Sequence, residues 1–494
     1  MGEKVMQQRI EKAQKEIECK KEIVKEGSMR QRYHFMGQTG WINDPNGLIF
    51  FKGKYHFFFQ YNPYEGFWGS MHWGHAVSDD MIYWSYLPVA LAPSEIYDDH
   101  IKGGCFSGSA IECDGKLFLM YTGVTDKGNG FEQTQCIAYS EDGIHFEKYE
   151  GNPVITAPEG IAKDQFRDPK VWKQGEWYYA VIGASRENRG LALIYRSRDM
   201  FHWEYLNILA ESRGEWGRMW ECPDLFPVGD KYVLTFSPIA SGDHTSVYLV
   251  GDFDCETGRF SSYISNEIDW GFDYYAPQSF LAPDGRRLTV GWSNGWEWMP
   301  LWKDWGPTYK EGWCGFFNVP REVRMLENGT LQFLPIKELE KIRENPQQIE
   351  EFVVPEMETE LTAGDGICFE LKFKVDLEKT DADKLELDLR CGEGKKTKCL
   401  FDFKRAELSI DRGESDGWSR GVSRSTMSLK EKRELDVHIL SDQSSLEIFS
   451  DQYQNNHSNN IFAGNEQKRL TIRAHGGKAV IRDYESYGMK KCFK

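Results

Sequence analysis

Short apolar stretches separated by glycine-containing turns repeat five times between residues 33 and 335. The copies are LIFFKGKYHFFFQYN, AIECDGKLFLMYTG, KVWKQGEWYYAVIG, DLFPVGDKYVLTFS and FLAPDGRRLTVGWS. Their turn glycines, 54 to 62 residues apart, are Gly53, Gly115, Gly175, Gly229 and Gly285. Each copy predicts a β-hairpin, because the runs are too short and too rich in β-branched and aromatic residues for a helix.

A second hairpin follows the first three copies. It lies in SDDMIYWSYL, SEDGIHFEKY and SRDMFHWEYL, with Trp84, Phe146 and Trp203 aligned. Two hairpins give four strands for each repeat. Because five such sheets bury both faces only by stacking around an axis, the pattern predicts a five-bladed β-propeller over residues 33–335.

Different patterns flank the propeller. Residues 1–32 contain QQRIEKAQKEIECKKEIVKE, which predicts a charged helical extension with a solvated packing role or a contact with another subunit. Residues 336–350 predict a polar helical linker. Residues 351–494 alternate in runs such as ICFELKFKVDL, KLELDLRC and SSLEIFSD, which predict a β-sandwich of structural or accessory role. The expected fold class is all-β.

Charge and cysteine usage exclude several partners. The chain carries 60 Lys and Arg against 77 Asp and Glu, a net charge of −17, which argues against nucleic acid and anionic membranes. It has no run of 18 apolar residues for a membrane span. Eleven cysteines without C-x-x-C spacing, and an N-terminus unlike a signal peptide, favour the cytoplasm. An oligomer is left open.

No cofactor or metal is expected from the sequence. KGGCFSGS is rich in glycine but lacks the G-x-x-x-x-G-K-[ST] pattern of a phosphate-binding loop. His72 and His75 have no Glu or Cys companion at metal-ligand spacing. Aromatic residues make up 14 % of the chain, which fits the cores of many strands better than a sugar-stacking surface.

Acidic residues stand at similar offsets before the turn glycines. Asp44, Asp168 and Glu221 lie 9, 7 and 8 residues before theirs, within WINDPNG, FRDPK and WECPD. Ser107 lies 8 before Gly115, and in the fifth repeat Asp273 and Tyr275 lie 12 and 10 before Gly285. Residues just before the innermost strands of a propeller converge on one mouth of its channel, so three carboxylates are expected to meet there.

For each motif alone, an acid that forms a turn or caps a strand is an alternative. Three acids at matched offsets favour a catalytic site over three separate structural roles. Two opposed carboxylates are what the hydrolysis of a glycosidic bond requires. The aromatic residues near these motifs could then form the floor of sugar subsites. They are Trp41, Trp68, Phe106 and Trp296.

The three motifs together resemble those of glycoside hydrolase family 32, which comprises invertases, sucrose-6-phosphate hydrolases and fructanases. The resemblance covers nearly the whole chain and implies a retaining β-fructofuranosidase. It implies that Asp44 is the nucleophile, Glu221 the general acid/base and Asp168 the transition-state stabiliser; the residues alone do not distinguish Asp44 from Asp168. It also implies sugar contacts from Asn43, Gln60, Trp68, Ser107, Arg167, Tyr275 and Trp296.

The resemblance leaves the substrate open among sucrose, its 6-phosphate, raffinose and short fructans. A fructosyltransferase or another furanosidase on the same fold is one alternative. A sugar-binding propeller without catalysis is another, although the complete set of acids speaks against it.

Overall fold

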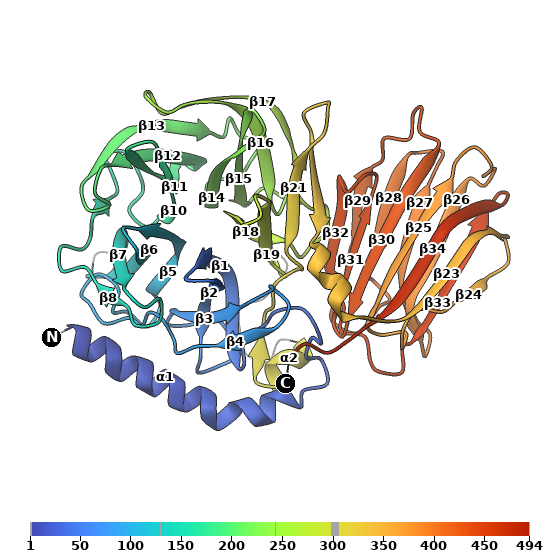
Figure 1. Ribbon diagram of the computed structural model, residues 1–494, viewed down its shortest axis with the longest axis horizontal. Helices are drawn as coiled ribbons and strands as arrows, with labels where there is room; N and C mark the ends of the chain where they lie inside the picture. The colour runs from blue at the N-terminus through green and yellow to red at the C-terminus, as the bar shows by residue number, and fades with distance from the viewer. Residues whose placement is uncertain (1, 129, 243, 298–305, 494) are drawn as a thin grey trace. The chain divides into compact units, whose positions relative to one another are not determined.

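The five sequence repeats form five sheets in the first of two units of the computed structural model (Figure 1). The structure describes residues 2–128, 130–242, 244–297 and 306–493. The first unit comprises residues 1–25, 36–267 and 275–330, and the second comprises residues 26–35, 268–274 and 331–494. The predicted fold class, a five-bladed propeller and a β-sandwich with a short N-terminal helix, is confirmed.

Each sheet of the first unit begins with a hairpin that the sequence predicted. The first sheet contains β20 (Trp313–Cys314), β1 (Gly40–Phe51), β2 (Lys54–Asn62), β3 (His72–Ser78) and β4 (Trp84–Tyr86), and the second contains β5 (Gly104–Cys113), β6 (Lys116–Asp126), β7 (Phe131–Ser140) and β8 (Glu147–Lys148), with β9 (Ile155–Thr156) against β7. The third sheet contains β10 (Phe166–Gln174), β11 (Trp177–Arg186), β12 (Arg189–Ser197) and β13 (Trp203–Glu211), and the fourth contains β14 (Met219–Val228), β15 (Lys231–Ile239), β16 (Val247–Asp254) and β17 (Arg259–Glu267). The fifth sheet has β18 (Tyr275–Leu281), β19 (Arg287–Trp292) and β21 (Arg321–Met325) in this unit, whose helices are α1 (Gly2–Lys25) and α2 (Gly306–Lys310).

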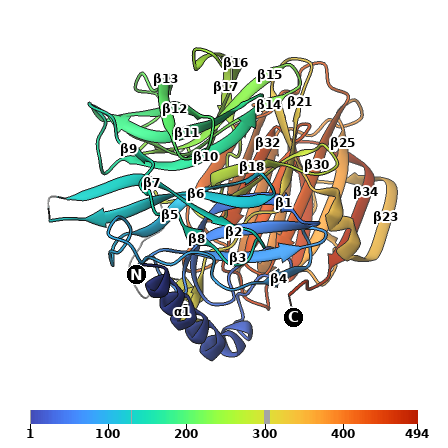
Figure 2. The same cartoon turned by 60° about the vertical axis from the view of Figure 1, so that its left-hand side comes forward.

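The first strands of the five sheets form a closed ring. β1 contacts β5, β5 contacts β10, β10 contacts β14, β14 contacts β18, and β18 contacts β1. Figures 1 and 2 show these strands toward the middle of the unit, with the later strands of each sheet outside them. Polar residues on these five strands are therefore brought toward one axis.

The turn glycines have a conformational role. All five have positive φ, from 62° at Gly175 to 87° at Gly285. A Cβ atom added at any of them would meet nothing within 4 Å. The requirement for glycine thus comes from the left-handed backbone and not from crowding.

A hydroxyl closes the second hairpin of each of the first three sheets. Ser78, Ser140 and Ser197 each accept a hydrogen bond through Oγ from the main-chain N–H three residues later, at 2.8 to 3.0 Å. The repeat that the sequence showed through aligned aromatic residues therefore also repeats its turn chemistry.

The N-terminal helix α1 packs against the first unit. Its buried residues are Met6, Ala13, Ile17 and Val24, and Met6 joins the apolar core of the first two sheets. The Arg9 guanidinium donates to the Pro93 carbonyl at 2.7 Å and pairs with the Asp99 carboxylate at 2.6 Å. The highly charged sequence of α1 thus conceals a narrow apolar stripe that holds the helix in place.

The second unit is a sandwich of two six-stranded sheets with a shared apolar core. The alternating runs of the sequence form its strands, with their apolar residues in that core. The unit contains β22 (Leu331–Pro335) and the 3-10 helix η1 (Lys337–Ile342), then one sheet of β23 (Arg343–Val354), β34 (Ala479–Met489), β25 (Phe369–Asp376), β30 (Glu434–Asp442), β31 (Ser445–Ser450) and β32 (Asn455–Asn460), and a second sheet of β24 (Thr359–Leu361), β33 (Arg469–His475), β26 (Lys384–Gly392), β27 (Lys395–Asp402), β28 (Glu407–Asp411) and β29 (Val422–Thr426).

The expected helical linker at residues 336–350 differs from the structure. Only η1 is helical, and the rest belongs to β23, an edge strand that pairs with β34. Most of β23 is exposed, so its Glu and Gln residues face solvent on an edge that pairs on one side only. A polar edge strand of this kind lacks the apolar alternation by which strands are predicted.

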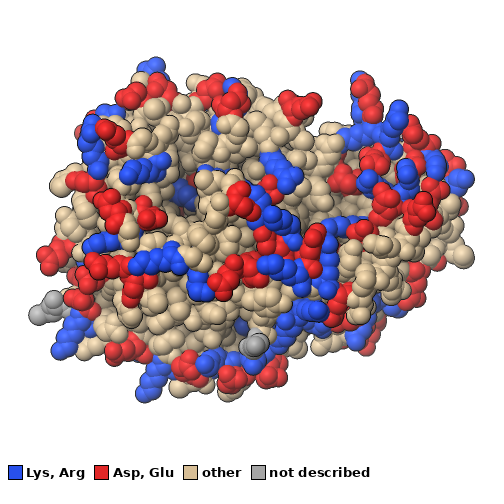
Figure 3. Space-filling model, in the orientation of Figure 1, with Lys and Arg blue, Asp and Glu red and all other residues tan. Residues whose placement is uncertain are grey.

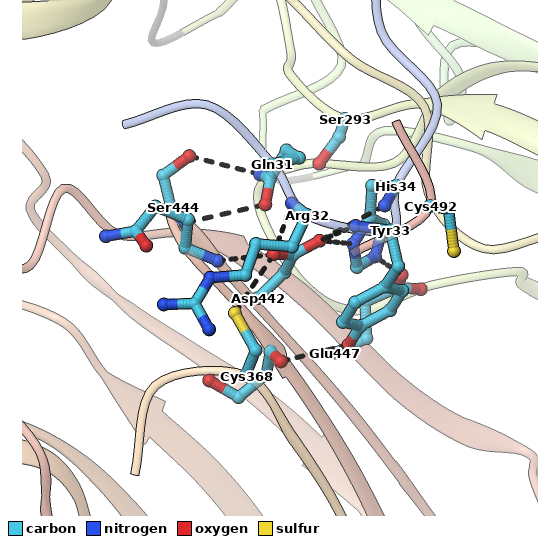
Figure 4. Close-up of polar contacts among 12 residues, drawn as sticks. Gln31, Arg32, Tyr33, His34, Ser293, Cys368, Asp442, Ser444, Glu447 and Cys492 are labelled. Carbon is cyan, nitrogen blue, oxygen red and sulfur yellow. Dashed lines mark hydrogen bonds and ion pairs between the residues drawn. The ribbon is translucent and has the colours of Figure 1, made fainter. Parts of the chain in front are cut away.

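A buried histidine clamps the N-terminal segment of the second unit to the sandwich (Figure 4). His34 Nδ1 lies 2.8 Å from Asp442 Oδ2, and His34 Nε2 lies 2.8 Å from Glu447 Oε1. Asp442 also accepts the main-chain N–H groups of Arg32, Tyr33 and His34 at 2.8 to 3.1 Å. Because both ring nitrogens face carboxylates, both are donors and the imidazole is protonated.

These contacts raise the pKa of His34 to about 9, since the hydrogen bonds and charges of Asp442 and Glu447 outweigh the burial that lowers it. The same histidine lowers the pKa of Asp442 to about 2 against the effect of burial. Glu447 stands in the SSLEIFSD run, so this strand of the sequence contributes one half of the clamp.

The surface carries mixed charge. Figure 3 shows acidic and basic side chains interspersed over the visible face, without separation into single-sign regions. Among the described residues, the structure has no helix of the length and apolarity that a membrane crossing requires.

We expect the His34→Phe variant to be less stable than the wild type by about 3–5 kcal/mol at pH 7, because it leaves two buried carboxylates without their cation. The raised pKa means that the stabilisation is complete below pH 6.5 and is lost as the pH rises through about 9. Urea unfolding at pH 7 and pH 10 measures both effects. The control is His145→Phe, whose ion pair with Asp142 is exposed. Equal losses in the two variants would contradict the clamp.

Candidate active site

Each innermost strand contains a β-bulge at the position of its sequence motif. The sequence placed these motifs just before the strands, but the structure places them within the strands. A bulge inserts an extra residue, interrupts the alternation and re-aims the side chains beside it, so a strand that carries one resembles a loop in the sequence. The ladder shifts register between Ile42 and Pro45, Phe106 and Gly108, Arg167 and Lys170, Glu221 and Asp224, and Tyr275 and Gln278.

Three of these bulges hold a non-glycine residue at positive φ. The φ angles are 64° at Asp168, 48° at Cys222 and 51° at Ala276. Such angles cost energy for residues with a Cβ atom. Their redirected N–H groups find partners: Asp168 N donates to Thr122 Oγ1, and Cys222 N donates to Asp168 Oδ2, both at 3.0 Å.

Asp44 is buried, with one oxygen in a hydrogen bond and the other buried without one. Its Oδ2 accepts a hydrogen bond from Ser107 Oγ at 2.7 Å and lies 3.7 Å from the Cys222 thiol. Its Oδ1 has no hydrogen-bond partner among the described residues. Burial, followed by the negative charge of Glu221, raises the pKa of Asp44 to about 6. This carboxylate is poorly solvated, and one of its oxygens has no hydrogen bond that a reaction would have to break.

Asp168 is the second buried acid. Burial raises its pKa to about 7; the Arg167 guanidinium opposes this shift, and the charges of Glu221 and Asp44 add to it. Arg167 Nε lies 3.9 Å from Asp168 Oδ2. Like charges this close disfavour the simultaneous ionisation of Asp44 and Asp168.

Glu221 is held from both sides. Its Oε1 accepts a hydrogen bond from Arg167 Nε at 2.9 Å and lies 2.9 Å from Arg167 Nη2 in an ion pair, and its Oε2 accepts the Tyr275 hydroxyl at 2.6 Å. Burial and the Glu221 charge raise the pKa of Tyr275 well above its usual value, so the phenol remains a donor. The two contacts fix the direction of the Glu221 carboxyl.

Cys222 joins the three acids. It follows Glu221 in the chain, and it contacts Asp168 through its N–H and Asp44 through its thiol. Burial raises the pKa of this thiol well above its usual value, so it is a protonated donor and not a nucleophile. The structure therefore brings Asp44, Asp168 and Glu221 into one cluster.

A cavity of about 420 Å³ opens beside this cluster, within the size range of small-molecule sites. Five of the expected residues line it: Trp68, Phe106, Arg167, Glu221 and Trp296. The rest of the lining comes from loop and strand positions that no catalytic motif marks in the sequence. They are Lys102, Val124, Phe131, Gln133, Asp164, Gln165 and Ile239.

Trp41 differs from the expectation of a sugar-stacking ring. It is 1 % exposed, stacks on Trp296 with centroids 6.2 Å apart, and donates from Nε1 to Asn43 Oδ1 at 2.8 Å. The Trp41 face is thus covered, and its contribution is to support Trp296 and Asn43. Gln60 is also buried, and its Nε2 donates to the Cys105 carbonyl at 2.9 Å.

Two other motif residues have partners outside the three acids. Asp273 pairs with the buried Arg412 at 2.6 Å within the second unit, although it stood at a similar repeat offset. His75 Nε2 lies 3.0 Å from His56 Nδ1. In the described part of the chain, no group of three His, Cys, Asp or Glu side chains is arranged to hold a metal ion.

Paired carboxylates on the inner strands of a five-bladed propeller, beside an aromatic-lined cavity, are the arrangement of a glycoside hydrolase. The models of the "Glycosyl hydrolases family 32 N-terminal domain" and "Glycosyl hydrolases family 32 C terminal" match residues 34–335 and 338–488. The chain belongs to glycosyl hydrolase family 32.

Individual relatives agree. A sucrose-6-phosphate hydrolase of Escherichia coli is 36 % identical over 473 residues, covering 91 % of this chain and 93 % of that protein. A GH32 beta-fructofuranosidase of Bombyx mori is 31 % identical with a TM-score of 0.82, covering 99 % of both chains. The structure of sucrose-6-phosphate hydrolase from Lactobacillus gasseri is 26 % identical with a TM-score of 0.85, covering 97 % of this chain and 96 % of that one.

The raised pKa of Asp44 has a consequence for stability. An acid whose pKa rises from 3.8 to about 6 on folding destabilises the native state when ionised, so stability falls as the pH rises from about 4 to 6. The Asp44→Asn variant removes this charge, and its amide oxygen can still accept from Ser107. We expect it to be more stable than the wild type by about 1–2 kcal/mol at pH 8 and equal at pH 4, measured by urea unfolding. The exposed control Asp79→Asn shows no such pH-dependent gain. A loss of stability at pH 8 would contradict the burial argument.

Proposed function

We propose that this glycoside hydrolase is a retaining β-fructofuranosidase that releases terminal non-reducing β-D-fructofuranosyl residues from sucrose, sucrose 6-phosphate or short fructo-oligosaccharides. The observation that carries the proposal is the cluster of Asp44, Asp168 and Glu221, tied together through Cys222 beside an aromatic-lined cavity. The names of the relatives support the substrate class.

In the proposed mechanism, Asp44 attacks the anomeric carbon of the fructosyl unit through Oδ1, the oxygen that has no hydrogen-bond partner. Ser107 holds Oδ2 and fixes the direction of attack. The bond between the anomeric carbon and the bridging oxygen breaks as the bond to Asp44 forms. Near-attack alignment of this kind supplies a large part of the rate acceleration.

Glu221 donates its proton to the departing oxygen and then takes a proton from water as that water releases fructose from Asp44. In this proposal the proton is delivered through Oε2, whose hydrogen bond comes from the neutral Tyr275 hydroxyl, whereas Oε1 faces the Arg167 guanidinium. Asp168 accepts hydrogen bonds from sugar hydroxyls that strengthen as the ring becomes oxocarbenium-like. Arg167 offsets part of the accumulated negative charge.

Further sugar contacts are proposed for Asn43, Gln60, Trp68, Phe106, Tyr275 and Trp296. Trp68 and Phe106 meet edge to face at 6.0 Å and form one wall of the cavity. Apolar rings of this kind pack against the faces of sugars. We also propose a cytoplasmic location, supported by eleven cysteines that are all free thiols.

We expect Glu221→Gln to lower kcat on sucrose by about a thousandfold or more, because the amide cannot donate the catalytic proton. Released fructose measures the rate. The matched control Glu176→Gln changes an exposed carboxylate that forms an exposed ion pair with Arg198. A substrate with a phenolate-type leaving group needs little protonation, so its first step is largely retained in Glu221→Gln. Unchanged sucrose turnover in Glu221→Gln would contradict the acid/base role of Glu221. A wild type that releases no fructose would instead support the non-catalytic alternative.

The pH profile reports the state of Asp44. Since the nucleophile must be ionised and its pKa is about 6, kcat/KM falls as the pH drops through about 6. The Ser107→Ala variant loses the hydrogen bond that stabilises the ionised form, so its acidic limb moves to higher pH. Initial rates between pH 4 and 8 measure the shift, with Ser261→Ala on exposed β17 as the control. A limb that stays in place or moves to lower pH in Ser107→Ala would contradict this assignment.

A further inference from the structure

One cation on the wall of the catalytic cavity lacks an acidic partner. Among the described residues that line the cavity, Lys102 and Arg167 are basic, and Arg167 is committed to Glu221. Lys102 is exposed and forms no ion pair among the described residues. In a chain of net charge −17, an unpaired lysine on the wall of a substrate pocket is the natural partner of an anionic substrate group.

The main chain of Lys102 is held in place. Its N–H donates to His100 Nδ1 at 3.1 Å, and the next residue, Gly103, donates to the His100 carbonyl at 3.1 Å. Strand β5 begins directly afterwards and carries Ser107, which contacts Asp44. The base of the lysine side chain is therefore fixed relative to the nucleophile.

Two glutamine amides add donors to the same wall. Gln133 Oε1 accepts from Phe166 N at 2.9 Å and from Arg167 Nη1 at 3.2 Å, and Gln165 Oε1 lies 3.4 Å from Arg167 Nη1. Because a guanidinium only donates, the amide oxygens must face it. The Nε2 groups of Gln133 and Gln165 make no hydrogen bond among the described residues, so they remain as donors on the cavity wall.

The acidic residues of the lining restrict where an anion can bind. Glu221 is neutralised by Arg167, but Asp164 is exposed and forms no ion pair among the described residues. A bound anion would therefore lie on the Lys102 side, while Asp164 suits hydroxyl groups, which donate. A phosphorylated sugar carries both kinds of group, since a phosphomonoester accepts several hydrogen bonds and the ring hydroxyls donate.

We propose that Lys102, with the amides of Gln133 and Gln165, binds a phosphomonoester on the leaving sugar and makes sucrose 6-phosphate a better substrate than sucrose. This inference rests on the proposed function. In sucrose 6-phosphate the phosphate is on the glucosyl unit, which departs when Glu221 donates its proton. Lys102 thus determines specificity at the leaving-group side and takes no part in bond cleavage.

The test compares kcat/KM for sucrose 6-phosphate and for sucrose in four proteins: the wild type, Lys102→Met, Lys102→Arg and Lys54→Met. We expect the ratio of the two kcat/KM values to fall about tenfold in Lys102→Met, mostly through KM for the phosphorylated substrate. Lys102→Arg keeps the cation and retains most of the preference. Lys54→Met removes a lysine that pairs with Asp79 outside the cavity, and keeps the wild-type ratio.

Product inhibition gives an independent readout. The inhibition constant for glucose 6-phosphate rises about tenfold in Lys102→Met, whereas that for glucose changes far less. An unchanged ratio and unchanged inhibition in Lys102→Met, or a wild type that prefers sucrose, would overturn the inference while leaving the proposed function intact. A wild type that releases fructose from neither substrate would overturn the proposed function itself.

Discussion

The crowding of three carboxyl groups around one buried cation is the constraint on which this active site depends. Burial and the charge of Glu221 raise the pKa of Asp44 and of Asp168, and the Arg167 guanidinium contacts both Asp168 and Glu221. Such a cluster opposes folding, because buried charges of one sign are poorly solvated and repel. The surrounding propeller must therefore hold it in place.

The bulges show how the propeller does so. Each innermost strand departs from its ladder at its motif, and one redirected N–H group, that of Cys222, donates to Asp168 Oδ2 within the cluster. The positive φ angles at Asp168 and Cys222 indicate backbone strain at the point where the acids are aimed. The flanking strand pairs supply the rigidity that maintains it.

Much of this organisation follows from the sequence alone. The five glycine turns and the alternating runs predict the propeller and the sandwich, since periodicity and turn chemistry are local properties. The matched offsets of Asp44, Asp168 and Glu221 predict their convergence, because a repeat places equivalent positions around one axis. The family resemblance adds their separate roles.

Other features depend on tertiary contacts without a local signature. The bulges interrupt the apolar–polar alternation that would have marked the motifs as strands. Strand β23 lacks this alternation for another reason, since it is an exposed edge strand with polar side chains. Trp41 adjoins the acids in sequence, yet Trp296 covers its face. Lys102 lies in a glycine-rich run that matches no phosphate-binding motif, and the fold brings it to the same cavity wall as Gln133 and Gln165.

The central claim is that Asp44 is a nucleophile that Glu221 assists. Its most direct test mixes Glu221→Gln with a fructofuranoside whose leaving group needs no protonation. The reaction is quenched, the protein is digested with a protease, and the peptide masses are measured by mass spectrometry. The account predicts that one fructosyl group is attached to the peptide that contains Asp44, because the second step needs the missing general base. A fructosyl group on Asp168, or turnover by inversion without any adduct, would contradict it.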